Sequence, residues 1–223
     1  MIKVLLADIA GVYGPQGFTS YLEKAGVPYE EAPVQGIEGT HCYCDREAER
    51  KITDALGEVT PKVRFIGSGD YHYLSCLLAQ GIKEPFSLLL MDHHPDNQAP
   101  ALGNVLSCGG WVNDLKERCS ALADVLTVGP EGCPQDIPEG WLESHRRVYV
   151  SLDKDIMGPQ YAVTGWTQGK HTLEDVKRML GKLSGVDVLA VDICGETEPE
   201  GCQAVNLATN IELLNHIIKT LDV

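Results

Sequence analysis

Carboxylate and imidazole side chains gather in the stretch DHHPD at 92–96, directly after the mostly apolar run FSLLLM at 86–91. An extended chain repeats every two residues. Asp92, His94 and Asp96 are therefore predicted to project to one side of the chain, with the intervening residues on the other. This stretch by itself could be a solvated loop, but a metal ion also binds carboxylates and imidazoles together.

A second stretch, SLDKD at 151–155, has the same design. The two-residue period sets Asp153 and Asp155 side by side, with Ser151 on the same face. Carboxylates at two buried strand ends would repel one another, because burying an unpaired charge costs several kcal/mol. A divalent cation resolves that conflict, so the two stretches together predict a metal site.

His72, in GSGDYH at 67–72, brings the total to two histidines and four aspartates. This number is too large for one ion and natural for two. Mainly carboxylate donors with a few imidazoles suit manganese or a similar ion, and two such ions can activate a shared water for hydrolysis. We therefore predict a pair of divalent ions, manganese or similar, with the ligands His72, Asp92, His94, Asp96, Asp153 and Asp155.

Apolar runs alternate with amphipathic stretches along the chain, which predicts an α/β fold with a mainly parallel sheet between two layers of helices. Ligands collect beyond the carboxyl ends of such strands, and the polar clusters stand there. The predicted strands are 3–9, 63–67, 86–92, 124–129, 147–153 and 186–194, with a weaker one near VPYEE at 27–31. The predicted helices are 20–26, 45–56, 70–82, 110–123, 171–183 and 204–221.

Length and composition narrow the class of protein. The 223 residues suit one domain, and the net charge of −14 argues against a nucleic-acid partner and favours cations. No apolar run is long enough for a membrane span or a signal peptide, so we expect a cytoplasmic protein. The eight cysteines are expected to be reduced; the Cys42 and Cys44 pair beside His41 lacks a second pair that would make a metal motif.

The two acidic stretches are similar to the motifs of a known family. DHHPD resembles the D-A-H-x-D signature, and SLDKD the S-x-D-x-D signature, of the arginase and agmatinase (ureohydrolase) family. GSGDYH resembles its G-G-D-H motif, and DICGETEP, at 192–199, its late D-x-x-E-x-N-P segment. The likeness runs in the family's order from about residue 63 to the C-terminus.

This resemblance implies a three-layer α/β/α arginase-like fold over residues 1–223 as one domain. It also implies two manganese ions and hydrolysis of a linear carbon–nitrogen bond in a small, cationic guanidino or amidino compound. Carried over by position, the six metal ligands are the same as those predicted above, and Glu196 would grip the guanidinium. Homo-oligomers are common in the family.

Several departures from the family fall at the substrate pocket. Asp70 and His72 are separated by one residue, whereas the family's motif has none between its Asp and His. Glu196 follows Asp192 by four positions, whereas the family's Glu follows its Asp by three. Cys108 stands where the family has a proton-shuttle histidine, and it is either a replacement shuttle or a small wall residue. Trp111 and Trp166 are expected in loops that rim the site, or as cover for a hydrophobic cluster.

Two other functions compete with the hydrolase. One is an amide deacetylase of the same fold with a single zinc, which needs fewer carboxylates than this chain offers. The other is a metal-binding protein without catalysis, which the missing shuttle histidine and the displaced Glu196 favour.

Overall fold

A computed structural model describes residues 2–99, 105–197 and 203–221. Its centre is a parallel sheet with the strand order β2-β1-β4-β9-β8-β5-β7. The strands are β1 (Val4–Leu6), β2 (Tyr29–Glu31), β4 (Val63–Phe65), β5 (Phe86–Met91), β7 (Leu122–Val128), β8 (Arg147–Asp153) and β9 (Asp187–Cys194). A separate antiparallel pair joins β3 (Tyr43–Cys44) to β6 (Leu106–Ser107).

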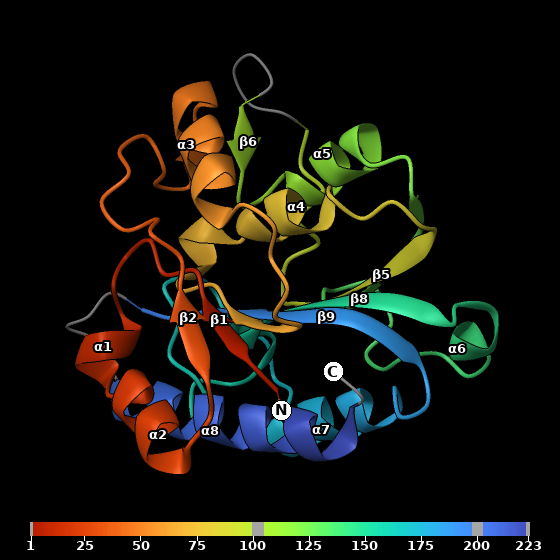
Figure 1. The fold of residues 1–223 in the computed structure, drawn as a ribbon. Helices are drawn as coiled ribbons and strands as arrows, with labels where there is room; N and C mark the ends of the chain where they lie inside the picture. Colours follow the sequence, from red (N-terminus) through yellow and green to blue (C-terminus); the bar gives the residue numbers. More distant parts are fainter. Residues whose placement is uncertain (1, 100–104, 198–202, 222–223) are drawn as a thin grey trace.

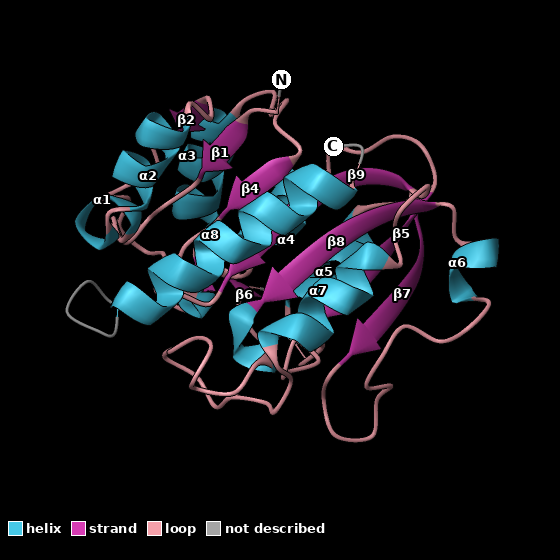
Figure 2. Ribbon diagram, turned by 90° about the horizontal axis from the view of Figure 1, so that it is seen from below, coloured by secondary structure: helices cyan, strands magenta, loops and turns pink. Residues whose placement is uncertain are grey.

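Helices cover both faces of the sheet, which gives the predicted three-layer α/β/α architecture (Figures 1 and 2). In Figure 1 the lower layer holds α1 (Tyr13–Gln16), α2 (Phe18–Ala25), α7 (Leu173–Gly181) and α8 (Gln203–Thr220). The upper layer holds α3 (Arg46–Leu56), α4 (Leu74–Ala79) and α5 (Trp111–Arg118), and the short α6 (Trp141–Ser144) lies at one edge.

The central strands are apolar throughout because both of their faces are covered. In β5, Leu89 and Met91 enter the core that the lower helices close. Leu88 and Leu90 enter the core under the upper helices. Each strand therefore anchors two cores, and its end is held rigidly between them.

Two helices begin at the residues that the sequence marks. The Asp45 carboxylate accepts the backbone N–H groups of Glu47 and Ala48 at the start of α3. Thr172 and Asp175 form a reciprocal capping box at the start of α7. Such caps satisfy backbone donors that the first helical turn leaves free.

The structure confirms the predicted strands and most helices, with three differences. The helix expected over 70–82 is a 3-10 turn at Gly69–Tyr71 followed by the shorter α4. The helix expected over 110–123 ends at Arg118, because β7 begins at Leu122. The β3–β6 pair and the short helices α1 and α6 were not predicted.

Four neighbouring strands carry the polar clusters. The order β4-β9-β8-β5 places the predicted site residues beyond four adjacent carboxyl ends. Within the described ranges, no helix is both long enough and apolar enough to cross a membrane.

Candidate metal centre

Three predicted ligands meet around the His72 imidazole. Its Nδ1 atom lies 2.9 Å from Asp96 Oδ2, 3.2 Å from Asp92 Oδ2 and 3.7 Å from Asp153 Oδ2. All four side chains are buried, at 9% exposure or less. His72, Asp92 and Asp96 could together hold one cation.

A second group lies beside the first and shares Asp92. His94 Nδ1 is 2.8 Å from Asp155 Oδ2 and 3.5 Å from Asp92 Oδ1. Asp92, His94 and Asp155 could therefore hold a second cation. The two groups line one pocket of about 240 Å³, and all six predicted ligands are among its lining residues.

The backbone brings these side chains together by a different route from the extended chain that we predicted. Beyond β5 the chain turns, and Asp96 adopts a left-handed φ of 45°. Beyond β8, Lys154–Ile156 form a 3-10 turn in which the Asp153 carboxylate accepts the Asp155 N–H at 2.8 Å. The convergence was predicted correctly, but tight turns produce it.

The electrostatics of the pocket show a surplus of negative charge. Burial raises the pKa of Asp153 and of Asp155 to about 6. A hydrogen bond to Asp155, with a second to Asp92, raises the pKa of His94 to about 10. Burial alone would lower the pKa of His72, but Cys194, Asp92 and Asp96 outweigh it and raise that pKa well above its usual value. These side chains therefore bind protons more tightly in the pocket than they would in water.

A buried chain of hydrogen bonds orients His72 from behind. Its Nε2 atom lies 2.8 Å from Ser151 Oγ, which lies 3.0 Å from Ser75 Oγ. The Ser75 hydroxyl donates to Asp192 at 2.8 Å, and Tyr149 also donates to this carboxylate. A metal-ligating histidine commonly has such a partner on its second nitrogen, so the chain leaves Nδ1 directed at the pocket.

Solved structures of known enzymes share this architecture. Arginase from Bacillus subtilis superposes with a TM-score of 0.68 at 12% identity, covering 100% of both chains. Proclavaminate amidino hydrolase from Streptomyces clavuligerus gives a TM-score of 0.68 at 16% identity, over 99% of this chain and 92% of that one. Entamoeba histolytica arginase, in a complex with L-ornithine, gives 0.67 at 12% identity, over 97% of each chain. The chain has the arginase fold.

Comparisons of sequence alone are less informative. An uncharacterized protein from Thermotoga maritima is 32% identical over 165 residues, which cover 69% of this chain and 63% of that protein. This chain therefore spans less than two thirds of that relative's length. No protein-family model matches the sequence.

Glu196, which we expected to grip a substrate guanidinium, faces away from the pocket of this arginase fold. Its carboxylate forms an ion pair with Lys154 and accepts hydrogen bonds from Gln16, Asn206 and Asn210 at 2.7–2.9 Å. It is 1% exposed and is not among the pocket's lining residues. The structure thus gives Glu196 a partner that sequence spacing could not reveal.

Gly195, at the family's carboxylate position, shows why the register differs. Its φ is +88°, and a Cβ atom there would approach Asp153 Oδ1 to 2.4 Å and the Lys154 nitrogen to 2.8 Å. A side chain at this position would displace one of the predicted ligands, so a carboxylate cannot stand there in this structure.

Cys108 lines the pocket and is 8% exposed. Burial raises the pKa of its thiol to about 12. A group that holds its proton so firmly at neutral pH is a poor shuttle. This geometry favours the wall residue of the two roles we considered.

The two tryptophans occupy different places. Trp166 is 42% exposed at the pocket, as expected of a rim residue. Trp111, however, is fully buried beneath it, where its Nε1–H donates to Asp96 at 2.7 Å and its ring lies 5.0 Å from that of His72. Trp111 therefore holds a predicted ligand from within a hydrophobic cluster, so of the two positions expected for it the structure shows the second and not the rim.

The donor set fits a pair of divalent ions. Four carboxylates and two imidazoles line the pocket, and none of the described lining residues is a lysine or an arginine. Buried carboxylates need a partner of opposite charge, and oxygen-rich sites of this kind suit manganese or magnesium-like ions. The shared Asp92 allows two ions to lie side by side.

Proposed function

We propose that this protein is a binuclear, manganese-dependent hydrolase of a linear carbon–nitrogen bond in a small guanidino or amidino compound. The observation that carries the proposal is the convergence of His72, His94 and four buried aspartates, from adjacent strand ends, in one pocket. The arginase fold supports the same reaction class, since similar structures carry the names arginase, agmatinase and amidino hydrolase.

The six predicted ligands would divide between two ions, with Asp92 and Asp153 shared by both. His72, Asp92, Asp96 and Asp153 would hold one ion, and Asp92, His94 and Asp155, with Asp153 shared, would hold the other. Bound ions would polarise the substrate and lower the pKa of a water so that it attacks at neutral pH. The buried positions of the ligands keep bulk water from screening these charges.

The remaining pocket residues would bind and orient the substrate. The surplus of carboxylates attracts a cation, and the half-exposed Trp166 at the pocket would supply a ring on which a planar guanidinium can stack. His94 is held through Nε2 by Thr167 Oγ1 at 2.8 Å. The Trp111 N–H holds Asp96, so these ligands should change little on binding.

Metal analysis and a substrate panel test the proposal directly. Protein purified without chelators should hold close to two manganese ions per chain, and it should release urea or ammonia from at least one guanidino or amidino compound. Protein that takes up two ions and turns over none of the panel would contradict the catalytic assignment.

A metal-binding protein without catalysis is the second candidate, and a specific observation favours it. Glu196 is committed to Lys154, and Cys108 holds its proton at neutral pH, so two groups expected to serve catalysis are otherwise engaged. A single-zinc amide deacetylase of the same fold would bind one ion per chain, so stoichiometry separates it from both.

A further inference from the structure

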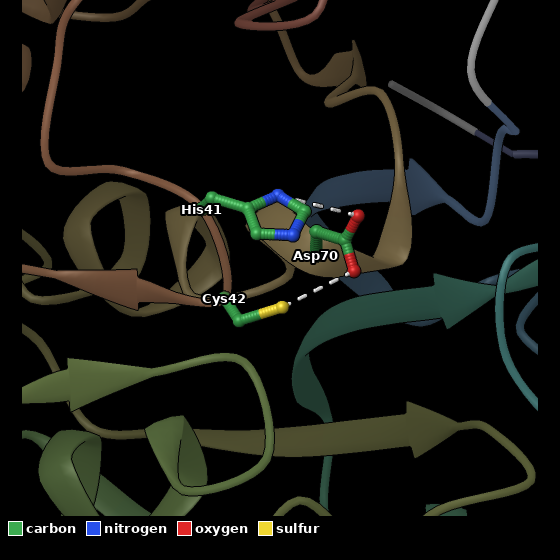
Figure 3. A group of neighbouring side chains, drawn as sticks. All are labelled: His41, Cys42 and Asp70. Atoms are coloured by element: carbon green, nitrogen blue, oxygen red, sulfur yellow. Dashed lines mark hydrogen bonds and ion pairs between the residues drawn. The ribbon is translucent and has the colours of Figure 1, made fainter.

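Three side chains outside the set of predicted metal ligands converge beside the pocket, which one of them, Cys42, also lines. His41 Nδ1 lies 3.8 Å from Asp70 Oδ2, and Cys42 Sγ lies 3.4 Å from Asp70 Oδ1. Figure 3 shows the imidazole and the thiol directed at the two oxygens of one carboxylate. One donor atom from each of the three residues can be chosen so that all three atoms lie within 4.8 Å of one another.

These separations are those of ligands that share an ion. In a tetrahedral zinc site the metal–ligand distances are about 2.0–2.3 Å, which places neighbouring donor atoms roughly 3.3–3.8 Å apart. The two distances to Asp70, one to each of its oxygens, lie in that range, and the third separation is at most 4.8 Å, so small side-chain rotations would bring the three donors around one ion. An imidazole, a thiol and a carboxylate are also a donor set that zinc accepts.

The backbone at Cys42 supplies an independent observation. Its φ is +56°, one of two positive values among the described non-glycine residues. Such a conformation costs about 1–3 kcal/mol in a residue with a side chain and persists at functional positions when surrounding structure enforces it. The Cys42 carbonyl accepts the Cys108 N–H at 2.9 Å, beyond the last β3–β6 pair, and this bond fixes the backbone from which the thiol reaches Asp70.

Asp70 is fixed as well. It follows Ser68, whose hydroxyl donates to Asp70 Oδ2 at 3.2 Å, and the Trp166 Nε1–H donates to Oδ1 at 3.0 Å. Its side chain is 18% exposed, whereas that of His41 is 72% exposed. A firmly held carboxylate beside an exposed imidazole and a positioned thiol leaves an open side from which an ion can enter.

We propose that His41, Cys42 and Asp70 form a further cation site, selective for zinc or a similarly thiophilic divalent ion. It is separate from the buried centre, which the six predicted ligands make from oxygen and nitrogen donors. Because Cys42 and Trp166 also line the pocket, an ion at this site would stand at its entrance. Three protein ligands would leave one position of a tetrahedral zinc open to solvent or to a small ligand.

Cobalt substitution tests the site, because a cobalt–thiolate bond gives a charge-transfer band in the near ultraviolet that oxygen and nitrogen ligands do not give. Protein whose buried centre has first been supplied with manganese should gain this band on addition of one equivalent of Co²⁺, and zinc should abolish it. The variants His41→Ala, Cys42→Ser and Asp70→Asn should each weaken zinc binding by more than about tenfold, since even outer-shell partners contribute about 10–100-fold. Cys42→Ser should also lose the band.

His41→Ala keeps the test decisive if a buried variant fails to fold, because that imidazole is largely exposed. Cys133→Ser, which changes a half-buried cysteine on another loop, serves as the thiol control and should retain the band. Cys194 lies 3.1 Å from Asp153 in the buried centre. A band that survives Cys42→Ser but disappears in Cys194→Ser would place the thiolate there and overturn the proposal, as would unchanged zinc affinity in His41→Ala. Neither result depends on turnover.

Discussion

The turn at the end of β8 sends its side chains to two buried regions that solve the same electrostatic problem differently. Asp153 and Asp155 enter the pocket, where four carboxylates share two imidazoles. Lys154, between them, is fully buried on the other side and pairs with Glu196 and with Asn210 at 2.8 Å. The region around Glu196 has its own cation, Lys154, whereas the pocket has more carboxylates than cationic side chains.

This difference separates a structural charge from a functional one. The Glu196 region is complete by itself, because Lys154, Gln16, Asn206 and Asn210 satisfy the carboxylate. The pocket is incomplete, as the raised pKa values of Asp153 and Asp155 indicate. Buried carboxylates without matching cations identify the pocket as the candidate metal site.

Asp153→Asn removes a carboxylate from the pocket alone, and its main expected effect is on the response of the protein to manganese. An ion at about 100 times its Kd stabilises a protein by about 2.7 kcal/mol. Manganese should therefore raise the melting temperature of the wild type and have little effect on the variant. Asp187 is half exposed at the start of β9, away from the carboxyl ends of the strands, so Asp187→Asn should behave like the wild type. An equal response of both variants to manganese would remove Asp153 from the ligand set.

Lys154→Met should destabilise the protein with or without metal. It leaves Glu196 buried without a cation, and breaking a buried pair in this way costs about 3–5 kcal/mol. The free energy of unfolding, measured with urea, should recover in part in the double variant Lys154→Met with Glu196→Gln. A single variant as stable as the wild type would show that the Glu196 region needs no internal cation.

The stability of the metal-free protein should fall as the pH rises. The folded-state pKa values of Asp153 and Asp155 are raised from 3.8 to about 6, so folding favours their protonated forms and this stabilisation is lost between about pH 4 and pH 6. The pKa of His94 is raised from 6.5 to about 10, so its protonation stabilises the fold below pH 6.5 and that contribution is lost as pH passes 10. Melting temperatures of metal-free and manganese-loaded protein should diverge with rising pH; parallel curves would contradict the assignment.

Ser75→Ala interrupts the chain that runs from His72 through Ser151 to Asp192. The bond between His72 and Ser151 remains, but the Ser151 hydroxyl loses its link to Asp192. Metal affinity should therefore fall by less than the about 10–100-fold that the loss of a direct outer-shell partner costs. Titration with manganese measures the change. Ser75→Cys, of similar size but a weaker donor, should fall between the variant and the wild type.

The smallest effect is expected at Cys108. Because burial raises the pKa of its thiol to about 12, Cys108→Ser and Cys108→Ala should both leave metal binding and turnover essentially unchanged. Loss of turnover in the alanine variant, with retention in the serine variant, would restore the shuttle role.

The sequence by itself determined the strands and the six residues that meet in the pocket. Those signals are local: an apolar run such as 86–91 must be buried, and the polar residues that follow it must stand at the sheet edge. Because parallel strands end at a common edge, their polar ends had to lie close together, whatever turns carried them there.

The tertiary structure alone decided the partners of individual side chains. Glu196 meets Gln16 across 180 residues of sequence, and Trp111 lies under Asp96 instead of at the rim. His41, for which the sequence offers no acidic neighbour, faces Asp70. Such contacts depend on how distant segments pack in three dimensions, and the period of a single strand or helix carries no information about them.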